Sequence, residues 1–499
     1  MTSNLTPHTP SSPSRSANFR LLVAKECRHV LFSPKFVAAG LVVTVVVLLA
    51  VLLGLREHAD FADRQHAAEQ WLVEQQAQAT DWMGLRHRAF RDADPMQIFV
   101  SGVHRDLGRH APIRGGVEPA LEHSIYGDEP IFAIFRTFDL AFVVTVVLSL
   151  FAIVFTYDAL CGEREAGTLR LLTSHAVPRT VVVGAKAVGL WLALMVPMLL
   201  AALLGLAVVL ASGVALDPDT WTRRGVLCAA AALYATVFTF LGVAASTLTR
   251  RATTSFLGLL AFWVLVVLVW PRAALVVAVQ QVPVPSAAEV DARLQGFENR
   301  AWEDNMRAMG ERWQGRSAQM EGMDEAARQE FEDANTWTWI EEDDAARQTT
   351  EAEIRAYGDR LRETVVARRQ AQRRVALNLS RLSPASAFQL IAVATAGTGV
   401  DLSERWQDAL RRYRDEHVDW VRTAGGESGT HSVRRSGGGG TFGDTGQTLD
   451  LGGMPRFVPP RPELSTALAE VPFDVGLLLI EALLALAVAL FAFQRYDVR

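Results

Sequence analysis

The fold is decided by uncharged apolar stretches such as FVAAGLVVTVVVLLAVLLGL, which runs from Phe36 to Leu55 between Lys35 and Arg56. A helix of about twenty residues, at 1.5 Å per residue, spans about 30 Å, the thickness of the hydrocarbon core of a bilayer. Stretches of the same kind recur at residues 140–157, 187–211, 225–249, 252–271 and 475–493. Because lipid offers no hydrogen bonds, each segment must satisfy its own backbone N–H and C=O groups. The six stretches therefore predict an all-α polytopic membrane protein with six transmembrane helices.

The composition agrees with a membrane protein and excludes several other classes. Hydrophobic residues make up 50% of the 499 residues, and the mean hydropathy is +0.16, which is more apolar than a soluble domain requires. The formal net charge of -5 gives no basic signature, so we expect no nucleic-acid partner. Cys27, Cys161 and Cys228 are too few and too scattered for a disulfide framework or a thiolate metal site.

Lysine and arginine residues predict the orientation of the chain in the membrane. They gather before the first span, in residues 158–186, at Arg250 and Arg251, and in the C-terminal tail with Arg495 and Arg499. These regions alternate with the spans and therefore fall on one side, which the positive-inside rule assigns to the cytoplasm. We expect a multi-pass protein of the bacterial inner (cytoplasmic) membrane with both termini in the cytoplasm.

Several segments are expected outside the membrane. Residues 1–18 are rich in Ser, Pro and Thr and predict a disordered N-terminal tail, while residues 494–499 form a short cytoplasmic tail. Residues 56–139 are polar and mixed in character, and they are expected to form a first extracytoplasmic insertion.

The longest polar segment, residues 280–474, predicts a mainly helical extracytoplasmic domain. From residue 287 to residue 382 it is rich in Glu, Asp, Arg, Gln and Ala and contains no proline, which favours helices. Residues 424–453 include the four consecutive glycines Gly437 to Gly440 and predict a flexible loop within this domain.

Sequence motifs for catalysis are absent. There is no Gly-x-x-x-x-Gly-Lys-Ser/Thr loop to cradle nucleotide phosphates and no His-Glu-x-x-His zinc motif. The 11 histidines do not cluster in sequence at the spacing of metal ligands. We therefore expect that this chain has no catalytic residue, no metal site and no bound cofactor, and is not an enzyme.

The most informative polar stretch is GEREAGTLRLLTS, from Gly162 to Ser174, within the predicted cytoplasmic coupling segment 158–186. A charged triplet after a glycine is followed there by a short apolar run. This pattern suits a short amphipathic helix at the membrane surface, with its charges offered to a soluble partner and its leucines turned towards the spans. An ordinary positively charged loop has the same composition, so the residues alone leave both interpretations open.

The stretch resembles the signature of ABC-2 type permeases, the membrane subunits of a large class of ABC exporters, in which Glu-Arg-Glu and Gly-Thr-Leu follow the second span. In that family the element seats in a cleft of a separate ATPase subunit and transmits the closure of that subunit to the spans. The resemblance implies that this ATPase-coupling role falls to Glu163, Arg164, Glu165, Gly167, Thr168 and Leu169.

Two further segments resemble parts of the same family. Residues 19–35, with Lys25 and Arg28 on their polar side, match the interfacial amphipathic helix before the first span, although a simple basic anchor has the same composition. The segment NLSRLSPASAF, from Asn378 to Phe388, is similar to a subfamily with a large extracytoplasmic insertion, related to gliding-motility and nitrous-oxide-reductase-maturation permeases. In ordinary members the connection before the last span is short and re-enters the membrane, so the long insertion departs from the family pattern.

The resemblance implies the permease subunit of an ABC-2 type exporter that works by alternating access. It implies as partners two copies of an ABC ATPase, which bind ATP and Mg, a second permease protomer in a homodimer or a pair with a similar paralogue, and membrane lipid. One alternative is ATP-driven mechanotransmission or envelope-protein maturation through the extracytoplasmic domain, with a periplasmic partner and no transported substrate. Another is a membrane enzyme whose active residues lie in that domain.

One carboxylate lies inside a span. Glu481 is about six residues from the outer end of the last stretch, or roughly 9 Å at 1.5 Å per residue. Carboxylates within a membrane are costly and usually face a cavity or a partner, so Glu481 is a candidate contact for a proton or a substrate. Protonation or snorkelling towards the surface is the alternative interpretation. Asp139 and Asp474 stand at the outer ends of their spans, where we expect solvated charges.

Overall fold

The computed structural model describes residues 15–79, 85, 87–114, 119–124, 138–174, 177–423, 448–449, 451–461, 463–469 and 471–495. Helices dominate these residues, and one two-stranded sheet is the only sheet among them. The prediction of an all-α protein is therefore confirmed. Most of the predicted tails and most of the predicted flexible loop 424–453 lie outside the described residues.

The chain divides into two compact units. The first consists of Met1–Val269 and Arg381–Arg499, and the second of Trp270–Ser380. The structure contains 6 helices that are long and apolar enough to cross a membrane, which confirms the predicted number of spans. They are Pro34–Ala77, Leu140–Glu165, Arg179–Ala211, Pro218–Leu248, Ala252–Gln281 and Pro472–Gln494.

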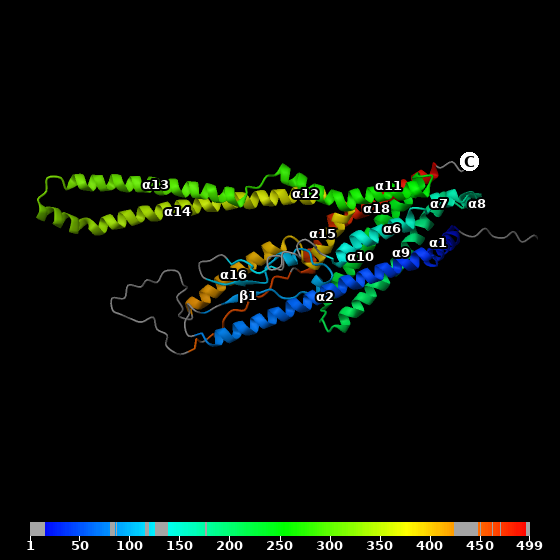
Figure 1. Ribbon diagram of the computed structural model, residues 1–499, viewed down its shortest axis with the longest axis horizontal. Helices are drawn as coiled ribbons and strands as arrows, with labels where there is room; N and C mark the ends of the chain where they lie inside the picture. Colours follow the sequence, from blue (N-terminus) through cyan, green and yellow to red (C-terminus); the bar gives the residue numbers. More distant parts are fainter. Residues whose placement is uncertain are drawn as a thin grey trace, which may run out of the picture. The chain divides into compact units, whose positions relative to one another are not determined.

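The first unit holds most of the elements (Figure 1). Most of its helical elements are α1 (Arg15–Leu31), α2 (Pro34–Ala77), α5 (Leu140–Phe142), the π-helical turn η3 (Val143–Leu148), α6 (Ser149–Thr156), α7 (Cys161–Glu165), α8 (Thr168–Ser174), α9 (Arg179–Ala211), α10 (Pro218–Leu248), α11 (Ala252–Trp263), the π-helical turn η4 (Val264–Val269), α15 (Pro384–Ala396), α17 (Leu464–Ala469) and α18 (Pro472–Gln494).

The first two helices differ in length from the predicted segments. α1 begins at Arg15, inside the predicted tail 1–18, and α2 continues past the predicted end of the first span at Leu55 to reach Ala77. Residues 56–77 contain no glycine or proline and are rich in helix-forming Glu, Gln, Ala and Arg, which explains why the helix continues. Part of the predicted first insertion is thus an extension of the first helix.

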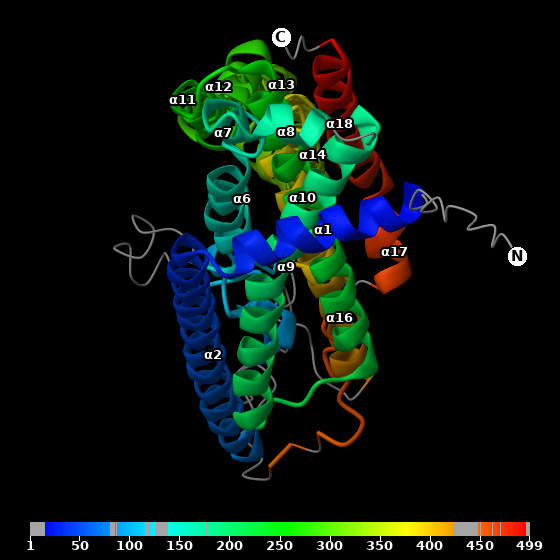
Figure 2. The ribbon, with the colours of Figure 1, turned by 90° about the vertical axis from the view of Figure 1, so that its right-hand side faces the viewer.

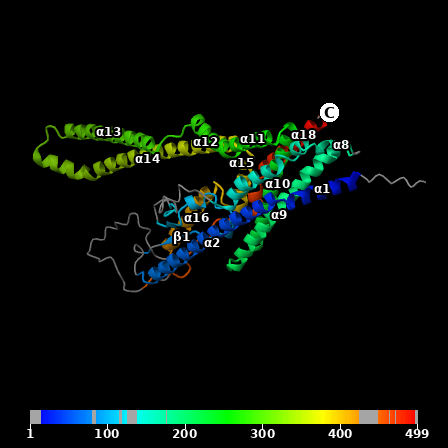
Figure 3. The same cartoon turned by 45° about the vertical axis from the view of Figure 1, so that its right-hand side comes forward.

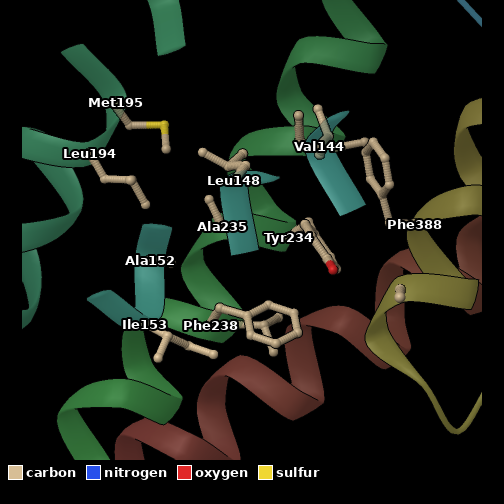
Figure 4. Close-up of a cluster of buried hydrophobic side chains, with 14 of the residues drawn as sticks. Val144, Leu148, Ala152, Ile153, Leu194, Met195, Tyr234, Ala235, Phe238 and Phe388 are labelled. Carbon is tan, nitrogen blue, oxygen red and sulfur yellow. The ribbon is translucent and has the colours of Figure 1, made fainter. Parts of the chain in front are cut away.

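The core of the first unit lies between α2, α6, α9, α10, α15 and α18. Figure 4 shows Tyr234 of α10 beside Phe388 of α15 and Val144 of η3, and the rings of Tyr234 and Phe388 have centroids 5.2 Å apart. The Tyr234 hydroxyl donates a hydrogen bond to the Thr145 carbonyl oxygen at 2.8 Å, so a polar group in the core has its partner. Small residues let the helices approach closely, as Gly242 of α10 does against Thr156 of α6.

The predicted domain 280–474 is divided by the structure. α15, which lies within this predicted domain, is buried in the core of the first unit against α10 and α18. Ser383 caps the start of α15 and also donates a hydrogen bond to the Val266 carbonyl oxygen at 2.7 Å, while Gly397 ends the helix in a left-handed conformation. Only residues up to Ser380 belong to the second unit.

The second unit contains α12 (Trp270–Gln281), α13 (Ala287–Gln319) and α14 (Glu325–Ser380). Figure 1 shows α13 and α14 side by side as an antiparallel hairpin. The Phe297 and Tyr357 rings stack across the hairpin with centroids 4.2 Å apart, and the Arg316 guanidinium lies 3.0 Å from Asp343 Oδ2. The prediction that this segment forms helices is confirmed.

The remaining elements of the first unit lie beside the distal half of α2 (Figure 3). They are β1 (Arg88–Phe90), η1 (Pro95–Ile98), η2 (His104–Asp106), β2 (His110–Pro112) and α16 (Leu402–Thr423). β1 and β2 pair antiparallel, with Ala89 opposite Ala111, and Trp406 and Leu410 of α16 pack on that pair. This part of the first unit thus has a small apolar core of its own.

Two histidines are buried in this part of the unit. His87 accepts or donates hydrogen bonds with Gln76 and with the Tyr413 hydroxyl, and its ring stacks on that of His417 with centroids 4.4 Å apart. Burial and the proximity of His417 lower the pKa of His87 to about 3, and burial lowers the pKa of His417. Both imidazoles are therefore neutral at physiological pH.

The expectation of solvated charges at Asp139 and Asp474 is wrong. Asp139 is 5% exposed and accepts hydrogen bonds from the Ser101 backbone N–H and hydroxyl and from the Phe142 N–H. Asp474 is 2% exposed and accepts from Arg381 Nε at 2.7 Å. Both carboxylates hold a helix start against a neighbouring loop, a tertiary contact that sequence position alone does not reveal.

Candidate functional site

The predicted coupling helix consists of two short helices. α7 ends at Glu165 and α8 begins at Thr168, and Gly167 between them has a φ of +73°. Glycine reaches this left-handed region without a Cβ penalty, so Gly167 permits the sharp change of direction. The six residues of the predicted element are therefore spread over a helix, a turn and the first residues of a second helix.

Glu163 of α7 points into the protein and pairs with Lys186 of α9. The Lys186 Nζ lies 2.9 Å from Glu163 Oε1 and 3.1 Å from Glu26 Oε1 of α1, and the lysine side chain is only 4% exposed. One buried ammonium thus joins three helices. Buried ion pairs resist separation because each partner left alone would be an uncompensated charge. The two ion pairs of Lys186 therefore connect α7 to α1 and α9.

Arg164 and Glu165 connect α7 to the turn between α10 and α11. Arg164 Nη1 donates a hydrogen bond to the Thr249 carbonyl oxygen at 2.8 Å, and Glu165 Oε1 accepts one from the Ala252 backbone N–H at 3.2 Å. The Ser246 hydroxyl accepts from the Cys161 backbone N–H at 3.1 Å, which fixes the start of α7 on α10. The charged triplet as a whole makes contacts inside this chain.

The outer surface of the segment is formed by other residues. Glu165, Gly167 and Thr168 are exposed, and Leu171 of α8 is 67% exposed, whereas Leu169 is 3% exposed. The interpretation that the charges face a partner and the leucines face the spans is thus inaccurate for Glu163, Arg164 and Leu171. The exposed residues thus form a surface suited to binding a partner. The residues behind them contact the long apolar helices.

α1 has the two faces expected of the predicted interfacial helix. Lys25 and Arg28 are exposed, while Glu26 and Val30 are buried. Figure 2 shows α1 lying across the direction of α2 and α9, and a Cβ at Gly189 of α9 would fall 2.8 Å from the Glu26 Cβ, so the two helices touch closely. This orientation is that of a helix lying flat beside spanning helices.

The prediction from sequence missed Glu26, Lys186 and Ser246. A signal for Glu26 existed, because it is the acidic residue of an otherwise basic helix and shares the face of Val23, Cys27 and Val30. Ser246 had no signal, since its role depends on the close approach of α10 and α7.

A cavity of about 910 Å³ lies beside the coupling segment at the ends of α10 and α18. Arg164, Arg250 and Arg495 line it together with the apolar side chains of Leu248, Val488 and Phe491. Arg495 stacks over the Phe491 ring at 4.0 Å from the centroid. No carboxylate is among its described lining residues, so the cavity is positively charged.

The structure places Glu481 away from this segment, within α18. Its Oε2 atom is buried and has no hydrogen-bond partner among the described residues. A carboxylate in that position retains its candidate role as a contact for a proton or a substrate. No contact among the described residues joins Glu481 to a predicted coupling residue.

One model of a known protein family matches almost the whole length of the chain. A family model described as ABC-2 family transporter protein matches residues 20–498. No curated protein sequence matches the chain. The match includes both units and the segment from α7 to α8.

Proposed function

This chain belongs to the ABC-2 transporter family and is a permease subunit of an ABC transporter, and from this premise we propose that it couples ATP hydrolysis by a separate ATPase to export. The observation that carries the proposal is the buried contact of Lys186 with both Glu163 and Glu26, which joins the coupling segment to α1 and α9. The resemblance to exporters implies that transport is outward across the bacterial inner membrane. The positive-inside distribution of Lys and Arg favours both termini in the cytoplasm.

The proposed mechanism begins at the exposed face of α7 and α8. ATP and Mg bind to two ATPase subunits, which close and move the segment from Glu163 to Leu172. Lys186 passes this motion to α9, and Arg164 passes it to the turn between α10 and α11. Two permease protomers, identical or closely similar, then change their packing and expose the path to the outside. Catalysis belongs to the ATPase, and this chain contributes no catalytic residue.

A second candidate function is supported by the second unit. The hairpin of α13 and α14 exposes Trp313 at 48% and Trp337 at 72%, and aromatic residues are enriched at protein interfaces. The hairpin suits the alternative in which ATP energy reaches a periplasmic partner by mechanotransmission or envelope-protein maturation. This agrees with the resemblance to the gliding-motility and nitrous-oxide-reductase-maturation subfamily.

The test is purification of the tagged chain from its native host in mild detergent, followed by identification of co-purifying chains and measurement of ATP hydrolysis. We expect an ATPase to co-purify, and we expect the charge reversal Glu163→Lys with Arg164→Glu to abolish its coupled activity. The matched control is Arg328→Glu with Glu332→Lys, an exposed ion pair on α14. A folded preparation with neither ATPase nor hydrolysis would refute the proposal.

The same preparation separates the two candidate functions. Replacing Trp337 with Ala should leave ATPase coupling intact under both. If the second function is correct, this substitution should abolish capture of a periplasmic protein by the chain. If the chain is an exporter, no periplasmic protein should be lost from the preparation when Trp337 is replaced.

A further inference from the structure

Three metal-ligating side chains meet in the extramembrane part of the first unit. His110 comes from β2, and Glu122 and His123 come from the described segment 119–124. The ligand atoms of all three lie within 4.8 Å of one another, and they form the only such group among the described residues. No spacing in the sequence predicts this cluster, because twelve positions separate His110 from Glu122.

The backbone holds the three residues in register. Glu122 forms an antiparallel bridge with His110, in which the Glu122 N–H donates to the His110 carbonyl oxygen at 2.8 Å. The Arg109 N–H donates to the Glu122 carbonyl oxygen, also at 2.8 Å. A Cβ at Gly108 would overlap the backbone of Glu122, so glycine is what permits this approach. The cluster is therefore fixed by main-chain contacts and does not depend on side-chain packing.

The side chains are oriented towards one another and keep their donor atoms available. The backbone of His123 has a φ of 60°, and its ring stacks over that of His110 with centroids 5.0 Å apart. None of the three side chains makes a hydrogen bond or an ion pair with another described residue. His110 is half-buried, whereas Glu122 and His123 are exposed, so the site is open to an ion from solvent.

We propose that His110, Glu122 and His123 bind a single zinc ion, with water completing the coordination. Two imidazoles and one carboxylate are a ligand set that zinc accepts, at bond lengths of about 2.0–2.2 Å. Bonds of that length bring ligand atoms to roughly 3.3 Å from one another, so separations of up to 4.8 Å close by at most about 1.5 Å, and the two exposed side chains can turn to do so. The hard cations Mg²⁺ and Ca²⁺ prefer sites made of oxygen ligands, so this set of two imidazoles and one carboxylate does not favour them.

Nearby charge limits the strength of the site. Arg88 of β1 and Arg109 lie close to His110 and oppose a cation there. Their charges are screened because the site faces solvent, and Glu122 offsets one of them. We therefore expect a site that zinc occupies reversibly, linking β2 to segment 119–124, which suits a response to zinc on the extracytoplasmic side of the membrane.

The test uses the full-length chain in detergent, purified with an affinity tag that contains no histidine, and titrated with Zn²⁺ against a chromogenic zinc indicator. We expect one saturable zinc per chain. His123→Ala and Glu122→Gln should weaken binding at least tenfold, since loss of a group that only hydrogen-bonds to a metal ligand already costs about 10–100-fold in affinity. His66→Ala, which changes an exposed histidine of α2, is the matched control and should leave binding unchanged.

Thermal unfolding provides a second measurement on the same samples. Zinc should raise the unfolding temperature of the native chain and of His66→Ala, but not that of His123→Ala, because a ligand stabilises only the state that binds it. Folding of the variants is checked by their unfolding temperature without metal, since His123 and Glu122 are exposed. Absence of saturable zinc, or equal zinc affinity in the native chain and His123→Ala, would overturn the proposal. Neither result depends on the ATPase, so the proposal fails or stands apart from the proposed function.

Discussion

The Lys186 ammonium of α9 lies 2.9 Å from the Glu163 carboxylate of α7, in a pocket where the lysine side chain is 4% exposed. Glu163 belongs to the short surface segment between the second and third spans, whereas Lys186 lies in the first turns of α9, the third span. The contact therefore connects the surface segment to the span. Glu26 of α1 shares the same ammonium at 3.1 Å, which adds the helix that precedes the first span.

Replacement of Lys186 by methionine should uncouple the transporter. The substitution leaves the carboxylates of Glu26 and Glu163 close together without a cation, and loss of one partner from a buried pair costs about 3 kcal/mol. We expect a lower unfolding temperature and loss of substrate-stimulated or basal coupled ATP hydrolysis in the purified complex. Lys186→Arg keeps the charge and should retain part of the activity.

A double variant checks that the effect comes from charge. In Lys186→Met with Glu163→Gln one unpaired carboxylate is removed, so stability should return partly towards that of the native chain. If the double variant is as unstable as the sum of the two single variants, the pair does not interact and this account of the contact is incorrect.

Replacement of Arg164 by alanine should separate the coupling segment from α10 and α11. The variant loses the hydrogen bond from Arg164 Nη1 to the Thr249 carbonyl oxygen, and a hydrogen bond from a charged donor contributes about 1.5–3 kcal/mol. We expect the ATPase still to co-purify, with coupled hydrolysis reduced at least tenfold. Arg328→Ala on α14 removes an exposed arginine and should have no effect. Full coupling in Arg164→Ala would exclude a role for this contact.

Gly242→Ala should weaken the packing of α10 on α6. A Cβ at this position would overlap Thr156, lying 2.6 Å from the Thr156 Cβ. Overpacking of a tight interface costs about 1–3 kcal/mol, so the unfolding temperature of the purified chain should fall. Gly258→Ala in α11 is the matched control, because no atom lies within 4 Å of its Cβ position. Thr156→Ala should restore part of the loss, and equal unfolding temperatures for the two glycine variants would contradict the observed helix contact.

The first unit should lose stability as pH falls below about 6.5. In the unfolded chain histidine binds a proton near pH 6.5, whereas burial lowers the pKa of His87 to about 3 in the folded protein and also lowers that of His417. The unfolded state thus binds more protons between these values, so stability is complete above pH 6.5 and decreases as pH falls towards 3. His87 contributes about 1.4 kcal/mol per pH unit in that window, and the lowered pKa of His417 acts in the same direction.

Thermal unfolding at pH 7.5 and pH 5.5 measures this dependence. The fall in unfolding temperature should be smaller in His87→Gln than in the native chain, because one of the two titrating groups is gone. His66→Gln, an exposed histidine, should behave as the native chain does. An unchanged pH dependence in His87→Gln would show that the stacked histidines do not carry the effect.

The spans were predictable because their signal is local. A run such as residues 36–55 needs no partner to be recognised, since length and lack of charge suffice. The ends were less predictable, and α2 continues to Ala77 because polar residues with high helix propensity follow the apolar run without a break. The division of residues 280–474 depends on α15 packing into the core, which is a tertiary contact.

The candidate site was predictable in position but less so in its contacts. GEREAGTLRLLTS stands out in the sequence by its motif, yet the contacts of Glu163 and Glu26 with Lys186 join residues that lie far apart in the chain. The zinc cluster shows the same limit, because His110 and Glu122 meet only when their backbones pair. Single-sequence patterns record neighbours along a helix or strand, and they do not record which elements pack together.

The central claim is that the exposed face of α7 and α8 binds the ATPase, and site-specific photo-crosslinking tests it most directly. A photoreactive amino acid at the exposed position of Thr168 is compared with one at Gln329, an exposed position of α14. The account predicts a nucleotide-dependent crosslink from Thr168 to the co-purified ATPase and none from Gln329. An ATPase that co-purifies but does not crosslink to Thr168, or that crosslinks equally at both positions, would contradict it.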